Sequence, residues 1–115
     1  MQTYIPQPLT VELGFVLPPL IKEAGLDGKF TKAMEVVGEA FQNIWTHNPY
    51  LAEYLVTHAH KRRLLCKMNL RECYHLLKLR TQPQAHFTIQ EVAFKILNEI
   101  KKVHPLLSKY LQLRK

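Results

Sequence analysis

The chain has 115 residues, of which 47% are hydrophobic and 22% charged, a composition that suits a packed domain and excludes wholesale disorder. Two cysteines, four glycines and seven prolines exclude a disulfide scaffold and a collagen-like chain. The formal net charge of +7 is uneven, because residues 1–57 hold three Lys/Arg against six Asp/Glu and residues 58–115 hold thirteen against three. The second half should therefore attract anions, whether nucleic acid, a nucleotide phosphate or an acidic protein surface.

The beginning of the chain predicts one short helix after an ambiguous segment. Residues 10–16 alternate apolar and polar side chains, which fits a short strand as well as a helical turn. The two prolines that open Pro18–Ala24 suit a first helical turn, and Gly25 suits the left-handed residue beyond a helix end. We expect a loop over residues 26–28.

The middle of the chain predicts the longest amphipathic helix. Apolar residues recur at i, i+3, i+4 and i+7 spacing over residues 29–47. Asn48-Pro49 should break this helix, and a further helix is expected over residues 50–59. Residues 61–68 begin with a run of charges and lack a clear helical period, so a strand or extended connector is at least as plausible as a helix there.

The next predicted helix carries the most distinctive polar side chains. Asn69 followed by Glu72 forms a capping pair, which predicts a helix that runs to Arg80. Its buried side should consist of the apolar residues Leu70, Cys73, Leu76 and Leu77. The opposite side should present three basic residues, Arg71, His75 and Lys78.

The last part of the chain predicts two more helices. Thr88 and Glu91 repeat the capping pattern after a loop over residues 81–84, and an apolar stripe then continues to the break at His104-Pro105. A final short helix is expected over residues 106–113. We therefore predict a mainly α fold of about five helices, with short strands possible at residues 10–16 and 61–68.

Domain organisation and location follow from what the sequence lacks. No segment resembles a linker, so residues 1–115 are expected to form a single domain. No window reaches the ~18 uninterrupted apolar residues of a membrane span, and Met1–Pro8 lacks the features of a signal peptide. We expect a cytoplasmic protein, with Cys66 and Cys73 reduced and buried.

The spacing of the potentially reactive residues argues against most kinds of catalytic or metal site. The histidines and cysteines do not form the two short pairs that a zinc site needs, so no metal is expected. Cys73 and His75 are two residues apart on a helix and point to different sides, which argues against a thiolate pair. The sequence contains neither a glycine-rich phosphate loop nor a paired-carboxylate arrangement.

Two basic clusters remain as candidate anion sites. The run Lys61-Arg62-Arg63 could contact a nucleic-acid backbone, although a solvated surface is the more common role of such a run. Arg71, His75 and Arg80 are more specific, since guanidinium groups bind phosphates in two-point fashion and an imidazole can hydrogen-bond or stack on a flavin or base. We expect these three side chains to face one hollow, with a solvated helix surface as the alternative.

The same region resembles a known family. The stretches Met68–Arg80 and Gln84–Ala93 are similar to the C-terminal part of flavin-dependent thymidylate synthases, whose pattern is approximately N-x-R-x-x-x-H/N-F-L-x-L-R followed by H-A-Q-x-E-I-x-x-x-A. The match is closest over residues 68–93. The resemblance extends to longer proteins that carry a degenerate second copy of this domain.

The resemblance implies methylation of dUMP to dTMP, with FAD as cofactor and NADPH and methylene-tetrahydrofolate as co-substrates. It also implies the fold of the helical C-terminal part of an α/β enzyme. By this resemblance, Asn69, Arg71 and His75 would contact the flavin. Arg80 would contact the nucleotide, and Gln84 occupies the position of a histidine beside the reaction centre.

The chain departs from the family pattern in three ways. Gln84 replaces that histidine, and Glu53 aligns with an arginine that holds the nucleotide, which reverses the charge there. The upstream signature R-H-R-x-x-S is absent from these 115 residues. Because sites in this family are assembled from several subunits, we expect a homo-oligomer or an upstream catalytic domain as partner, and no turnover by this chain alone. The alternative is a noncatalytic basic helical module that binds nucleic acid or pairs with a catalytic copy.

Overall fold

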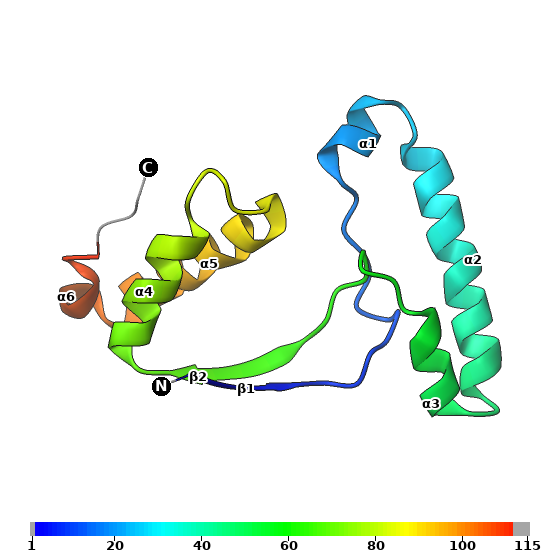
Figure 1. Cartoon of the computed structure of the whole chain (residues 1–115), viewed down its shortest axis with the longest axis horizontal. Coiled ribbons are helices and arrows are strands. Elements are labelled where there is room, and N and C mark those ends of the chain that lie inside the picture. Colours follow the sequence, from blue (N-terminus) through cyan, green and yellow to red (C-terminus); the bar gives the residue numbers. More distant parts are fainter. Residues whose placement is uncertain (1, 112–115) are drawn as a thin grey trace. The chain divides into compact units, whose positions relative to one another are not determined.

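The computed structural model describes residues 2–111, which form a mainly α chain with two short strands (Figure 1). This confirms the predicted fold class. The chain divides into two compact units, which we call the N-unit (Tyr4–Leu65) and the C-unit (residues 66–111 with residues 2–3).

The described part of the N-unit is built from α1 (Pro19–Glu23), α2 (Asp27–Trp45), α3 (Pro49–Ala52) and the short 3-10 helix η1 (Glu53–Leu55). Gly25 has a φ of +73° and follows α1, as predicted. Asn48 caps α3 by accepting the backbone N–H groups of Tyr50 and Leu51. The helices α2 and α3 lie side by side, and their contact buries Phe41 and Ala52 (Figure 1).

Two sequence predictions for these helices are wrong at their ends. Residues 26–28 do not form a loop, because α2 begins at Asp27 and the Leu26 carbonyl already accepts the Phe30 N–H. The helix expected over residues 50–59 ends at Leu55. The helix stops there because the Thr57 N–H donates to the His60 ring at 3.0 Å and so does not donate to a helix carbonyl.

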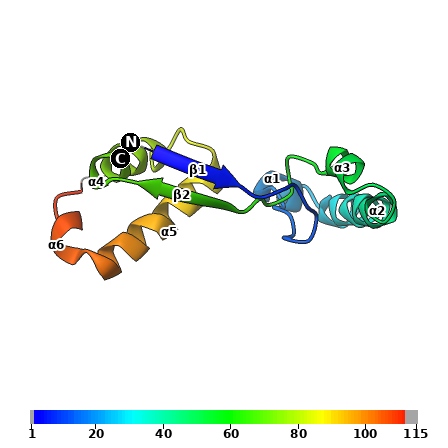
Figure 2. The ribbon, with the colours of Figure 1, turned by 90° about the horizontal axis from the view of Figure 1, so that it is seen from below.

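The strands also differ from the prediction. Residues 10–16 form neither a strand nor a helical turn: Gly14 has a φ of +81°, and only Phe15 forms a β-bridge, to His60. The strand suggested for residues 61–68 is confirmed as β2 (Leu64–Met68). Its partner β1 (Gln2–Pro6), which was not predicted, runs in the opposite direction (Figure 2). Each of these strands belongs partly to each unit.

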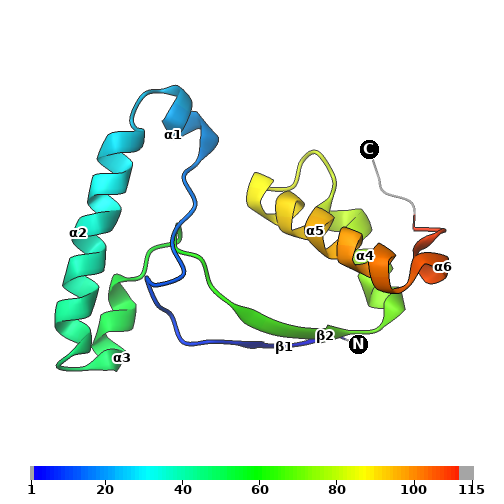
Figure 3. The ribbon, with the colours of Figure 1, turned by 180° about the vertical axis from the view of Figure 1, so that it is seen from behind.

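The helices of the C-unit are α4 (Leu70–Arg80), α5 (Phe87–Val103) and α6 (Pro105–Ser108) within the described range. The bounds of α4 match the prediction, and the Asn69 side chain accepts the Glu72 N–H at 2.9 Å. α5 packs across α4 (Figure 3). Leu77, Ala93 and Leu97 form the small buried core between them.

Three other expectations for the C-unit need correction. Thr88 is not the N-cap of α5, because the helix begins one residue earlier and the His86 ring accepts the Thr88 N–H. The last helix ends at Ser108, and residues 112–113 of the predicted helix lie outside the described residues. Cys66 is exposed rather than buried because it lies on the open strand β2. Cys73 is half-buried, and this burial raises the pKa of its thiol.

Candidate functional site

The exposed side of α4 carries the residues that the resemblance assigned to a flavin. Arg71 and His75 are exposed and lie one turn apart on the same side of the helix. Asn69 precedes the helix, and its Oδ1 is occupied by the cap. The cap fixes the orientation of this amide, so its Nδ2 group is left as a donor for another molecule.

Arg80 and Gln84 lie at the other end of α4. Arg80 is the last residue of the helix, and Gln84 is exposed in the turn that follows. Nine residues separate Arg71 from Arg80, which at about 100° per residue places Arg80 roughly half a turn around the helix. The structure therefore brings Arg71 together with His75 but directs Arg80 toward a different side of α4.

The three basic side chains are free to bind an anion. Within residues 2–111, none of Arg71, His75 and Arg80 forms a side-chain hydrogen bond or an ion pair. The ion pairs of the C-unit are instead two local ones on α5, Lys95 with Glu91 and Lys102 with Glu99. A multivalent anion at α4 would thus not have to compete with an existing carboxylate partner.

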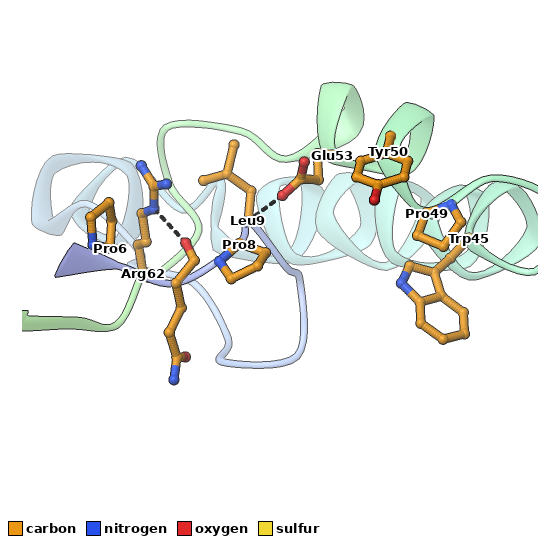
Figure 4. A pocket seen from close by; sticks show the side chains of 9 residues that line it. Pro6, Pro8, Leu9, Trp45, Pro49, Tyr50, Glu53 and Arg62 are labelled. Atoms are coloured by element: carbon orange, nitrogen blue, oxygen red, sulfur yellow. Dashed lines mark hydrogen bonds between the residues drawn. The ribbon is translucent and has the colours of Figure 1, made fainter.

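The N-unit contains a hollow of about 580 Å³ that the sequence did not predict (Figure 4). Glu53 and Arg62 line it, together with Trp45, Tyr50 and the segment Pro6–Leu9. Three prolines among the lining residues and two neighbouring aromatic residues are the sequence signals that could have indicated it. Neither this hollow nor the one of about 500 Å³ along α5 is lined by Arg71, His75 or Arg80.

Glu53 has a structural role in the N-unit. Its Oε1 accepts the backbone N–H of Leu9 at 2.8 Å, across 44 residues of sequence. This carboxylate stands where the resemblance places a nucleotide-binding arginine. The charge reversal predicted from the sequence thus coincides with a hydrogen bond that holds the N-unit together.

No group of three or more His, Cys, Asp or Glu side chains among the described residues could hold a metal ion. No helix in the described part of the chain is long and apolar enough to cross a membrane.

Comparison with known proteins decides the family. The family model described as thymidylate synthase complementing protein matches residues 2–106. The chain belongs to this family. The match includes the whole N-unit, the C-unit as far as residue 106, and every residue of the candidate site.

The relatives of this family member are longer than the chain. A UPF0159 protein of Thermoplasma acidophilum is 36% identical over 104 residues, which are 89% of this chain and 21% of the relative. A UPF0159 protein of Chlamydia muridarum is 31% identical over 106 residues, or 92% of this chain and 20% of the relative. The flavin-dependent thymidylate synthase of Sulfolobus acidocaldarius is 31% identical over 104 residues, which are 83% of this chain and 37% of the relative. The chain thus spans between about a fifth and two fifths of the length of the curated relatives that it matches.

Proposed function

We propose that this chain supplies part of the site of a flavin-dependent thymidylate synthase-like assembly. In such an assembly, FAD would carry a hydride from NADPH, and methylene-tetrahydrofolate would provide the carbon that converts dUMP to dTMP. Membership of the family supports this relationship. Because the chain spans at most 37% of the synthase from Sulfolobus acidocaldarius, the reaction is proposed for the whole assembly and not for this chain alone.

The unpaired basic side of α4 is the observation that carries the proposal. Asn69 would donate through Nδ2, and Arg71 and His75 would add a guanidinium and an imidazole on the exposed side. This donor set fits the acceptor-rich edge and the phosphates of FAD. It fits only part of the cofactor, so the remaining contacts would come from chain segments outside these residues.

The two residues assigned to the substrate, Arg80 and Gln84, would bind it at a position separate from the flavin. Arg80 is the last residue of α4 and points about half a turn away from Arg71, and Gln84 lies in the turn beyond the helix. We propose that one chain contributes to flavin binding at one end of α4 and to dUMP binding at the other. Such a split requires a partner, either further copies in a homo-oligomer or an upstream catalytic domain.

The chain alone is proposed to be inactive. Glu53 would repel a nucleotide phosphate, and its carboxylate is held by Leu9. Proximity effects worth ~7 to 11 kcal/mol depend on a complete site geometry, which a partial site cannot provide. We further propose that residues 1–115 act as one domain, since one family match runs through the N-unit and most of the C-unit. A cytoplasmic location is proposed because free cysteines suit a reducing compartment.

Ligand titration of matched variants tests the proposal. FAD binding should weaken about tenfold or more in Arg71→Ala, because one charge-assisted contact is lost. dUMP binding should weaken similarly in Arg80→Ala. Lys101→Ala, which removes an exposed charge from α5, should change neither affinity by more than about twofold.

Two outcomes would count against this assignment. If FAD and dUMP bind the wild type and all three variants equally, or do not bind at all, the site is wrongly placed. If all three variants instead weaken binding of duplex DNA alike, with a slope of log affinity against log salt near −0.9 per neutralised phosphate, the nucleic-acid alternative replaces it.

A further inference from the structure

The hollow of the N-unit presents two opposite charges that are both anchored to one short segment. Glu53 Oε1 accepts the Leu9 N–H at 2.8 Å, and Arg62 Nε donates to the Gln7 carbonyl at 3.1 Å (Figure 4). Each charged group is therefore held in place before any ligand arrives. Such preorganisation reduces the entropy lost on binding.

The two charges do not neutralise each other. No ion pair joins Glu53 to Arg62 within the part of the chain that the structure describes. Glu53 retains Oε2 as an acceptor, and Arg62 retains the N–H groups of both terminal nitrogens as a two-pronged donor. The hollow thus offers one anionic and one cationic contact to the same ligand.

The other residues that line the hollow are mostly apolar, and those beyond Glu53 include two aromatic rings. Trp45 is 50% exposed, and Tyr50 lines the hollow near it (Figure 4). Pro8 and Pro49 add rigid apolar surface. Aromatic faces bind flat rings and cations, and about 580 Å³ lies within the usual range of roughly 300–1,000 Å³ for small-molecule sites.

We propose that this hollow binds a small zwitterion, with an amine and a carboxylate at opposite ends of a flat apolar body. The ammonium group would pair with Glu53, the carboxylate with the free nitrogens of Arg62, and the body would lie along Pro8 and Leu9, which stand between these two residues (Figure 4). This site uses no residue of α4. A failure of this proposal would therefore leave the proposed flavin and nucleotide function unaffected, and the reverse also holds.

The only tryptophan of the chain provides a direct measurement. Because Trp45 lines the hollow, its fluorescence should change when a ligand binds there. The probe is para-aminomethylbenzoate, with benzylamine and benzoate as single-charge controls of the same ring. The zwitterion should bind about tenfold more tightly than either control, as expected for one additional charge-assisted contact.

Neutral variants of similar shape assign the two ends of the ligand. In Glu53→Gln, which retains an oxygen for the Leu9 N–H, the zwitterion should lose its advantage over benzoate. In Arg62→Gln it should lose its advantage over benzylamine. Glu12→Gln and Lys61→Gln remove exposed charges elsewhere in the N-unit and should leave the affinity unchanged. Arg62→Lys keeps the positive charge but lacks the two-pronged guanidinium donor, so it should bind the zwitterion with intermediate affinity.

Equal binding of all three probes to the wild type would overturn the proposal, as would unchanged zwitterion affinity in both neutral variants. Displacement of the probe by dUMP, with Arg62→Gln abolishing dUMP binding, would also overturn it in favour of a nucleotide site.

Discussion

The two units of this chain use their polar groups differently. The N-unit has six basic and six acidic side chains, whereas residues 66–115 with 1–3 have ten basic and three acidic ones. In the N-unit, Glu53 and Arg62 hydrogen-bond to backbone groups 44 and 55 residues away. In the described C-unit, the side-chain hydrogen bonds are short-range apart from that between Tyr74 and Leu107. Charged side chains thus anchor distant backbone in the first unit, whereas Arg71, His75 and Arg80 of the second have no side-chain partner among the described residues.

The stability of the C-unit should depend most on its apolar core. Leu77→Ala removes a fully buried side chain between α4 and α5, and should lower the free energy of unfolding by about 2–5 kcal/mol. Urea denaturation followed by far-ultraviolet circular dichroism measures the change. Leu106→Ala, at a position 81% exposed, is the control and should change it by less than about 0.5 kcal/mol. A small effect of Leu77→Ala would show that this core does not determine the stability of the C-unit.

The N-unit should instead be sensitive to a long-range hydrogen bond. Glu53→Ala leaves the half-buried Leu9 N–H without its acceptor and should cost about 1–3 kcal/mol. Urea denaturation monitored through Trp45 fluorescence reports on this unit. Glu53→Gln should cost less because its amide oxygen can accept the same N–H. If Glu53→Ala and Glu53→Gln lower the free energy of unfolding equally, the hydrogen bond to Leu9 does not have the stated role.

The cap of α4 should make a smaller contribution that can be separated from ligand binding. Asn69→Ala should lower the free energy of unfolding by about 1 kcal/mol, because the Glu72 N–H loses its partner. Asn69→Asp retains the acceptor but lacks Nδ2, so it should preserve stability and weaken FAD binding. Thermal denaturation and FAD titration of the two variants measure these effects. If FAD binding is weakened in neither variant, Asn69 has only the structural role of capping α4.

The smallest expected effect is a pH dependence in the N-unit. Burial lowers the pKa of His60, whose Nδ1 accepts the Thr57 N–H. The unfolded chain therefore takes up the proton first as the pH falls. The stabilising contribution of neutral His60 is complete above the ordinary pKa of about 6.5 and is lost as the pH falls from there through the lowered folded value.

Urea midpoints at several pH values between about 7.5 and 5 would measure this dependence. His60→Asn, which can still accept the Thr57 N–H but does not titrate, should flatten the profile. His58→Asn is the control and should retain it. Identical profiles for His60→Asn and the wild type would refute the assignment to His60.

Local chemistry explains which elements could be predicted. The cap at Asn69 and the basic end of α4 define that helix within its own 11 residues. Prolines at the first positions of α1 and α3 act in the same local way. The prediction was wrong where a neighbouring side chain competed for a backbone group, as His60 does for the Thr57 N–H and His86 for the Thr88 N–H.

The sequence by itself determined where most helices lie, the Asn69 cap of α4, the excess of positive charge in the second half and the polar side of α4, because these properties depend on residues close to one another in the chain. Only the tertiary structure decided that β1 pairs with β2, that Glu53 holds Leu9, and that the hollow beside Trp45 contains two unpaired opposite charges. The strand pairing and the hydrogen bonds of Glu53 and Arg62 join residues 44 or more positions apart, and no local pattern specifies which distant backbone group a side chain will meet.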